Sequence, residues 1–263
     1  MCCFFCKMYK IVNMKLTDLL IIDIETVPAK TKYSDLDEAG KLLFNDKATK
    51  IVPLQGNIEE IYKKRAGIWA EFGKVVCIGA GFFLPLPSEQ WELQLFSFSG
   101  HAEEQILRDF TLFCETWQSR NRDFRFAGHN IREFDIPFLG RRMLINGLPL
   151  PESLRLQDKK PWEVTHFDTL GYWKFGDYKN YISLHLLANV LQIPSPKRGI
   201  SGADVQDLYY QHNNLQGIVH YCKQDVLATS RIIQRLINLP PVEDNQVKSW
   251  RDPNWGTMFT TLS

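Results

Sequence analysis

Apolar positions near the start of the chain form a run with the length of a strand. Residues 19–25 are nearly all apolar, which predicts a strand buried on both faces of a sheet. Residues 75–84 and 91–98 form two further strand-like runs, and the short segment between them contains Pro85 and Pro87. This order predicts an antiparallel hairpin.

The middle of the chain alternates between helical and strand-like patterns. One apolar stripe at helical spacing consists of Ile106, Leu107, Phe110, Phe113, Cys114 and Trp117. Residues 124–127 predict a short strand, and residues 134–146 predict a helix that Gly147 ends. Residues 164–167 are the last predicted strand, with Asp168 directly after it as a helix cap or a supporting residue without a catalytic role.

The last third of the chain is predicted to be helical. Ser183 can cap a helix that runs to residue 191, and residues 201–204 resemble a capping box for the next helix. The final helix is predicted at about residues 215–237 and ends before Pro240. Residues 27–72, by contrast, are polar and irregular, with one predicted helix at about residues 58–69.

A hairpin followed by strands that alternate with helices predicts an α/β fold. We expect three layers, with a mixed central sheet of about five strands and helices on both faces. The length of 263 residues suits one large domain, which we place at residues 14–240. Residues 241–263 are then a polar tail. Residues 1–13 are expected to be a disordered leader, or to result from a start codon assigned too early.

Composition adds little about partners. Apolar residues make up 44% and charged residues 23%, as in ordinary globular proteins, and the net charge is +1. A nucleic-acid enzyme needs only a local basic strip, although scattered solvated charges explain any single cluster more simply. The candidate basic clusters are Lys63-Lys64-Arg65, Arg141-Arg142, Lys159-Lys160 and Lys197-Arg198.

The apolar runs and the cysteines indicate a cytoplasmic protein. No run approaches the roughly 18 apolar residues of a membrane span, so we expect no membrane partner. The chain has six cysteines; three cluster before residue 7, and Cys77, Cys114 and Cys222 sit singly in apolar segments. This spacing fits reduced, buried thiols better than a disulfide framework or a zinc site.

Asp23 and Glu25 are the first candidates for chemistry. They lie two residues apart on the first predicted strand, so both side chains leave the same face. A buried strand rarely carries two carboxylates, because unpaired buried charge is costly and like charges repel. Divalent cations such as Mg²⁺ or Mn²⁺ would resolve that conflict. A strand end with solvated acids explains the pair alone equally well.

A second acidic site follows the strand predicted at residues 124–127. Asn130 and Asp135 bracket the turn into the next helix, where the helix dipole favours a carboxylate. Phe134 is an aromatic candidate for contact with a nucleobase, and His129 for contact with a phosphate. An Asn in a turn and an Asp near a helix start also occur without any function.

Tyr221 and Asp225 lie four residues apart on the final predicted helix, and therefore on one side of it. The spacing alone means little, because Tyr33 and Asp37 repeat it in a polar segment. His220 competes with Tyr221, since it precedes Asp225 by five residues. On a continuous helix His220 points about 140° away from Asp225 and Tyr221 only about 40°, which favours Tyr221.

These segments together resemble the three exonuclease motifs of the DEDD (DnaQ-like) superfamily. The first motif is D-x-E at Asp23 and Glu25, and the third is Y-x3-D at Tyr221 and Asp225, as in the tyrosine branch of the superfamily. H-x4-D at His220 and Asp225 would instead be the pattern of the histidine branch. The second is N-x3-F-D, which consists of Asn130, Phe134 and Asp135. The resemblance spans about residues 17–238, and it is greatest to bacterial 3′–5′ exonucleases related to the proofreading domain of family B DNA polymerases.

The resemblance implies a ribonuclease H-like fold and a two-metal 3′–5′ exonuclease that releases nucleoside monophosphates. Two Mg²⁺ or Mn²⁺ ions would be held by Asp23, Glu25, Asp135 and Asp225, and Tyr221 would position the attacking water. Thr26, Asn130 and Phe134 would contact the terminal nucleotide. The expected partner is a single-stranded DNA end. RNA, or a catalytically silent nucleic-acid-binding module, are the alternatives.

Overall fold

The computed structural model describes residues 14–51, 57–87, 90–177, 179, 181–194 and 204–250. The predicted leader at 1–13, residues 201–203 of the predicted capping box and residues 251–263 of the predicted tail lie outside this range. So do Lys197 and Arg198, one of the candidate basic clusters. No described helix is both long and apolar enough to cross a membrane.

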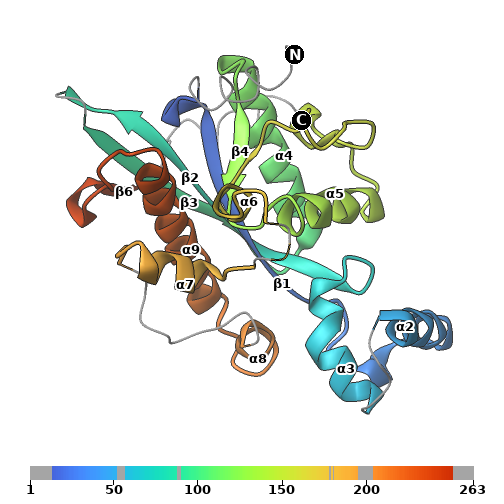
Figure 1. The fold of residues 1–263 in the computed structure, drawn as a ribbon. Helices are drawn as coiled ribbons and strands as arrows, with labels where there is room; N and C mark the ends of the chain where they lie inside the picture. Colours follow the sequence, from blue (N-terminus) through green and yellow to red (C-terminus); the bar gives the residue numbers. More distant parts are fainter. Residues whose placement is uncertain are drawn as a thin grey trace.

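A mixed sheet forms the centre of the molecule (Figure 1). Its described strands run in the order β5-β4-β1-β2-β3-β6. β2 pairs antiparallel with both β1 and β3, which confirms the predicted hairpin, and the β1–β4, β4–β5 and β3–β6 pairs are parallel. The strands are β1 (Leu19–Pro28), β2 (Gly73–Pro85), β3 (Trp91–Ser99), β4 (Arg125–Gly128), β5 (Phe167–Asp168) and β6 (Val247–Ser249).

Two details of the sheet differ from the prediction. The strand predicted at residues 164–167 shortens to the two residues of β5, which pair with β4 at the edge of the sheet. The last described strand is instead β6, in the segment predicted to be a polar tail, where Val247 pairs with Leu93 of β3. A three-residue strand with a mostly polar sequence carries too few apolar positions to be recognised before its partner is known.

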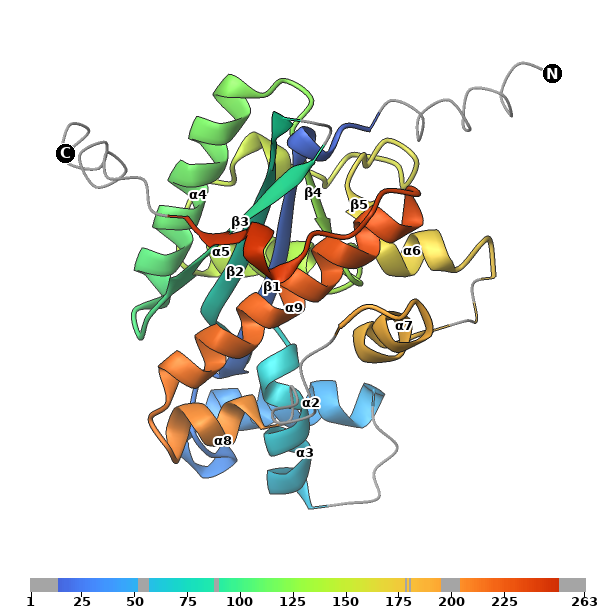
Figure 2. The same ribbon diagram turned by 90° about the vertical axis from the view of Figure 1, so that its left-hand side faces the viewer.

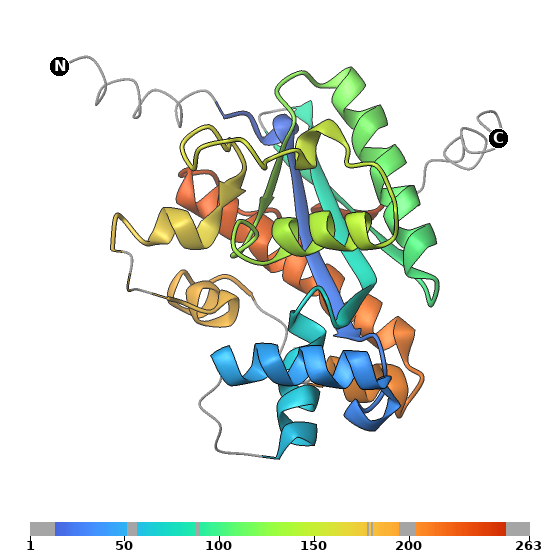
Figure 3. The same ribbon diagram turned by 90° about the vertical axis from the view of Figure 1, so that its right-hand side faces the viewer.

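Helices cover both faces of the sheet. α4 (Glu103–Arg120) and α5 (Asp135–Ile145) pack on one face, and α9 (Leu215–Leu236) crosses the other (Figures 2 and 3). Ser183 caps the helix α7 (Leu184–Val190) by accepting a hydrogen bond from the Leu186 N–H, and Gly147 follows α5 with a positive φ of 68°, both as predicted. The remaining helices are α2 (Glu38–Ile51), α3 (Ile58–Arg65), α6 (Thr169–Trp173), α7 (Leu184–Val190) and α8 (Val205–Tyr210), with 3₁₀ turns η1 (Leu16–Asp18), η2 (Tyr33–Asp35), η3 (Ala66–Ile68), η5 (Glu152–Leu154) and η6 (Asp244–Gln246).

The two cores show which way the side chains of β1 point. Leu20, Ile22 and Ile24 belong to the core under α4 and α5. Leu19 and Ile21 belong to the core under α9. Because side chains alternate along a strand, Asp23 and Glu25 continue the row that faces α9.

Gly79 and Gly81 in β2 let α9 approach the sheet closely. A Cβ atom at Gly79 would lie 2.8 Å from the Cys222 Sγ, and one at Gly81 would lie 3.1 Å from the Val226 Cγ1. The Gly79 N–H donates to that sulfur at 3.2 Å. The Gly-Ala-Gly sequence at residues 79–81 therefore makes room for a helix.

The segment from residue 27 to residue 72 is more ordered than predicted, because it contains α2 as well as α3. α2 buries only Phe44 and Ala48, while Leu42 and Leu43 are exposed, so its sequence shows no helical apolar stripe. Phe44 packs in an aromatic cluster with Tyr33, Tyr62, Trp69 and Phe72.

The Tyr33–Asp37 pair has a local structural role. The Tyr33 hydroxyl donates to the Asn45 side chain at 3.1 Å, and the Asp37 carboxylate accepts from the Gly40 N–H at 2.7 Å, in the first turn of α2. Neither side chain lines the pocket that contains Tyr221 and Asp225.

Candidate active site

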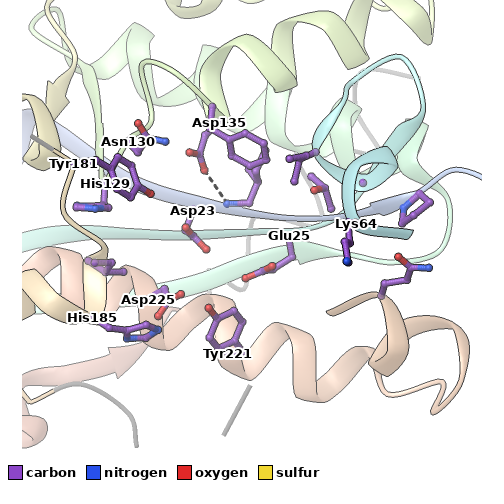
Figure 4. Close-up of a pocket in the computed structure, with 18 of the residues that line it drawn as sticks. Asp23, Glu25, Lys64, His129, Asn130, Asp135, Tyr181, His185, Tyr221 and Asp225 are labelled. Atoms are coloured by element: carbon purple, nitrogen blue, oxygen red, sulfur yellow. Dashed lines mark hydrogen bonds between the residues drawn. The ribbon is translucent and has the colours of Figure 1, made fainter. Parts of the chain in front are cut away.

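The predicted site residues line one pocket of about 700 Å³, between the second half of β1, α3 and α9 (Figure 4). The segments that supply them lie far apart in the sequence: β1, the turn from β4 into α5, and α9. All eight predicted catalytic, metal-binding and substrate-binding residues are present: Asp23, Glu25, Thr26, Asn130, Phe134, Asp135, Tyr221 and Asp225.

Asp135 reaches the pocket because β1 is longer than its neighbour β4. The pairing between the two strands covers Leu19 to Ile21 on β1 and ends there. Beyond it, the Ile24 N–H donates to the Asp135 Oδ1 at 3.0 Å, so this carboxylate takes the place of the missing strand. Asp135 is the first residue of α5, where the helix dipole favours a negative charge.

Asp168 shapes the turn that carries Asn130. Its carboxylate accepts from the Asn130 N–H at 2.9 Å and the Arg132 N–H at 3.1 Å, and it caps α6 through Leu170 and Gly171. This confirms the prediction that Asp168 acts as a cap. Asn130 has a left-handed φ of 63°, and its side-chain oxygen is buried without a hydrogen-bond partner in the described part of the chain.

α9 directs Tyr221 and Asp225 into the pocket and leaves His220 exposed outside it. The Tyr221 hydroxyl lies beside the Asp225 carboxylate (Figure 4). This is the orientation that the helix geometry predicts. Burial, followed by the charges of Asp225 and Glu25, raises the pKa of Tyr221 above its ordinary value, so the phenol stays protonated.

The four acidic side chains of the pocket lie close enough together that each disfavours the ionisation of the others. Burial raises the pKa of Asp23, and the nearby Asp135 and Asp225 raise it further. Glu25 shifts in the same direction through burial and then Asp23. Burial also raises the pKa of Asp225, and that of Asp135 to about 7. Such a group of uncompensated acids favours the binding of a cation.

The donor atoms fit divalent cations. Carboxylate oxygens are the ligands that Mg²⁺ and Mn²⁺ prefer, and the buried Asp225 Oδ1 has no hydrogen-bond partner among the described residues. Ligand atoms of Asp23, Glu25 and Cys222 lie within 4.8 Å of one another. The Cys222 thiol already bonds to the Asp23 backbone oxygen at 3.3 Å and to its Oδ2 at 3.4 Å, which holds the Asp23 side chain in place.

The structure also brings residues to the pocket that the sequence did not single out as part of a site. Lys63 and Lys64 come from α3, one of the candidate basic clusters, and Lys63 pairs with Asp207 of α8 at 3.2 Å. Tyr181 lies on the rim and is 66% exposed. None of the three is near a motif in sequence, so only the tertiary contacts place them. Further lining residues are Ile24, Pro28, Gly67, Ile68, Leu184, His185 and Gln206.

Two histidines also line the pocket. One is His185, whose interaction with Asp225 favours the ionised carboxylate. The other is His129, the candidate for phosphate contact, and both of its ring nitrogens are engaged. Nδ1 lies 2.8 Å from the Thr169 hydroxyl, and Nε2 lies 2.9 Å from the Ile182 carbonyl oxygen. Burial lowers the pKa of His129, so the ring is neutral and mainly supports the fold.

We expect Mg²⁺ to stabilise the protein more at about pH 8 than at about pH 5. The folded-state pKa of Asp135 is about 7, above its ordinary 3.8, and the other three carboxyls shift upward too. The metal-free protein therefore loses stability as the pH rises from about 4 through 7, and the cation offsets this loss once the acids ionise. The free energy of unfolding, measured in chelator and in Mg²⁺ at both pH values, tests this expectation. Equal stabilisation by Mg²⁺ at both would contradict the expectation.

Comparisons with known proteins agree with this geometry. The family described as a predicted 3′–5′ exonuclease related to the exonuclease domain of PolB matches residues 70–239, more than half of the chain. The structure is similar to the family B DNA polymerase of the hyperthermophilic archaeon Pyrobaculum calidifontis, with a TM-score of 0.51 and 16% identity over 83% of this chain and 24% of the polymerase. It also matches the RNase domain of the yeast Pop2 protein, with a TM-score of 0.35 and 13% identity over 83% of this chain and 80% of that domain. No curated protein matches this chain.

The likeness to the polymerase, together with the mixed sheet covered by helices on both faces, confirms the ribonuclease H-like α/β fold. The family match begins after β1, so it does not include Asp23 and Glu25, and their place in the site rests on the geometry described above. The chain belongs to the family of predicted 3′–5′ exonucleases related to the exonuclease domain of PolB.

Proposed function

We propose that this enzyme is a divalent-metal-dependent exonuclease of the tyrosine branch that degrades single-stranded DNA from its 3′ end. It hydrolyses the terminal phosphodiester bond and releases nucleoside monophosphates. The observation that supports this most directly is the convergence of Tyr221 and four carboxylates in one pocket, three of them buried and that of Asp23 partly buried. A phosphodiester brings further negative charge into this pocket, so cations are needed for both enzyme and substrate.

Two Mg²⁺ or Mn²⁺ ions are the proposed cofactors. Asp23, Glu25 and Asp225 would hold one ion, and Asp23 with Asp135 would hold the other, directly or through water. When bound, such ions lower the pKa of the attacking water and stabilise the charge on the leaving 3′ oxygen.

Tyr221 orients the water that attacks the phosphorus. Its hydroxyl lies beside Asp225, and burial raises its pKa, which keeps the proton on the phenol oxygen. The oxygen lone pairs can then accept a hydrogen bond from the water beside the ligand Asp225. Tyr221 therefore acts by positioning, while a carboxylate or bulk solvent takes the proton.

We expect Tyr221→Phe to lower kcat by roughly 10- to 100-fold, because the water loses its orientation while the carboxylates remain. His220→Ala serves as the matched control on the adjacent, exposed position, and its kcat should equal that of the wild type. Steady-state hydrolysis of a labelled oligonucleotide measures both variants. A large loss with His220→Ala and none with Tyr221→Phe would move the enzyme to the histidine branch.

Residues around the acids provide contacts for the nucleic acid. Thr26, Asn130 and Phe134 are proposed to hold the terminal nucleotide. The Asn130 Oδ1, which has no hydrogen-bond partner among the described residues, suits a donor of the substrate. Lys64 lies opposite Tyr181 across the pocket (Figure 4). Lysine can bind backbone phosphate, and an exposed tyrosine ring offers a stacking surface to a base of a single strand.

A side-by-side digestion tests the proposal. DNA and RNA oligonucleotides of one sequence, labelled at either end, are incubated with Mg²⁺, Mn²⁺ or chelator. We expect metal-dependent release of monophosphates from the 3′ end of the DNA. Preferential digestion of the RNA would select the ribonuclease alternative, and binding without hydrolysis would identify a silent binding module.

A further inference from the structure

A second concave surface lies on the side of α5 that faces away from Asp135. α5 and the segment at residues 150–164 enclose a groove of about 510 Å³. Figure 3 shows α5 in front of the sheet with this segment folded beside it. Ile136, Gly140 and Leu144 recur every four residues and form the helical wall of the groove, and Leu150, Leu154 and Leu156 line it from the other segment.

The groove is apolar but has a positive rim. Arg132, Arg141 and Lys159 line it, and no Asp or Glu is among the described residues of the lining. Among the described residues, neither Arg141 nor Lys159 forms an ion pair. The Arg132 guanidinium donates to the neutral carbonyls of Val164 and His166, which leaves its charge in place. Two of the candidate basic clusters therefore supply residues to this surface rather than to the acidic pocket.

The rim charges are only partly compensated from outside the groove. Asp168 attracts the charge of Arg132, and Glu71 attracts the charge of Arg141, but neither carboxylate belongs to the lining. A ligand that brings its own carboxylates would therefore complement this surface.

The side chains of the groove favour a peptide over a nucleic acid. The apolar part of the lining is aliphatic or proline, and the described lining residues include no aromatic ring on which a base could stack. Leu144 is 60% exposed and the adjacent Ile145 is 53% exposed. Exposed aliphatic side chains beside an apolar groove are typical of a protein interaction site.

We propose that this groove binds a partner protein through an acidic segment. Apolar side chains of the segment enter the groove between α5 and residues 150–164, and its carboxylates contact Arg141 and Lys159. The surface is separate from the pocket that contains Asp23, so a bound partner leaves the proposed exonuclease site open.

A binding titration tests the proposal on the full chain in chelator. The probe is a fluorescein-labelled peptide of four aspartates followed by Leu-Pro-Leu-Phe. We expect half-saturation at about 100 µM or below, which corresponds to a modest interface. Two comparison peptides, one with serines in place of the aspartates and one with serines in place of the apolar residues, should bind at least about 10-fold more weakly.

Variants locate the binding surface. Arg141→Glu combined with Lys159→Glu should weaken binding by about 10-fold or more, and Leu144→Ser by about fivefold. Lys41→Glu combined with Lys50→Glu is the matched control, because it changes the net charge equally on the surface of α2, where both lysines form local ion pairs. The control should bind like the wild type.

Three outcomes would overturn the proposal: no binding of the acidic peptide at about 1 mM, equal weakening by the control pair, or displacement of the peptide by a nuclease-resistant single-stranded oligonucleotide. The last result would make the groove part of a nucleic-acid path. The titration requires no hydrolysis, so a negative result here leaves the exonuclease proposal standing. A protein that digests no oligonucleotide can in turn still bind the peptide.

Discussion

Asp23→Asn is expected to reduce metal-dependent hydrolysis by about 10³-fold or more while making the metal-free protein more stable. Asp23 is the proposed ligand to both ions, so loss of its carboxylate weakens the binding of both. Its carboxylate also lies in a partly buried position where Asp135 and Asp225 repel it. Asparagine removes that repulsion and can still accept the bond from the Cys222 thiol, which reaches the Asp23 Oδ2 at 3.4 Å in the wild type.

The gain in stability should reach about 1 kcal/mol or more at neutral pH in chelator, because one unit of pKa displacement corresponds to about 1.4 kcal/mol. Chemical unfolding measures it. In Mg²⁺ the wild type should be more stable than the variant, since it gains metal-binding energy that the variant has lost. Retained activity, or a metal-free variant less stable than the wild type, would contradict the assignment of Asp23.

Asp168→Asn makes the same change of charge and should have the opposite effect on stability. Asp168 accepts four backbone N–H bonds, from Asn130, Arg132, Leu170 and Gly171. Three of these N–H groups share the Asp168 Oδ1, and the Arg132 N–H bonds to the Oδ2. An amide has one acceptor atom instead of two, so the Arg132 N–H loses its partner and faces an NH₂ group. We therefore expect this variant to lose stability both with and without Mg²⁺. The pair of variants separates a carboxylate that serves the site from one that serves the fold.

The sequence could predict the acidic site because its residues lie on regular elements. Period-two alternation places Asp23 and Glu25 on one face of β1, and a spacing of four places Tyr221 and Asp225 on one side of α9. These relations hold inside a single element. Whether the elements meet at the same pocket depends on strand order, which the family resemblance supplied and the sheet topology now shows.

Features that depend on contacts between distant segments could not be predicted in this way. Lys64 and His185 reach the pocket only because α3 and α7 pack beside it. β6 is a strand because Val247 meets Leu93, and its own three residues carry no strand signal. The contacts of His129 were unpredictable for the same reason, since the Thr169 hydroxyl and the Ile182 carbonyl that engage its two ring nitrogens lie on distant segments.

Gly79→Ala is expected to lower activity by about 100-fold without touching any residue that contacts the substrate. The added Cβ would lie 2.8 Å from the Cys222 Sγ and 3.2 Å from the Cys222 backbone oxygen. A backbone atom cannot move aside by a rotamer change, so α9 must shift away from the sheet. Tyr221 and Asp225 lie on either side of Cys222 on that helix, and both would move with it. Oligonucleotide hydrolysis measures the loss of activity. Thermal unfolding measures the loss of stability, which we expect to be about 1–3 kcal/mol.

Gly140→Ala is the matched control, because a Cβ atom at this helical position meets nothing within 4 Å. It should keep full activity and gain about 0.5–1 kcal/mol, since alanine favours the helix. Adding Cys222→Ala to Gly79→Ala removes the sulfur but leaves the backbone oxygen, so activity should recover in part. Full activity of Gly79→Ala would show that α9 can shift without disturbing Asp225. The close approach at Gly79 would then contribute to packing alone, and the position of the catalytic acids would have to be set by β1 and α5.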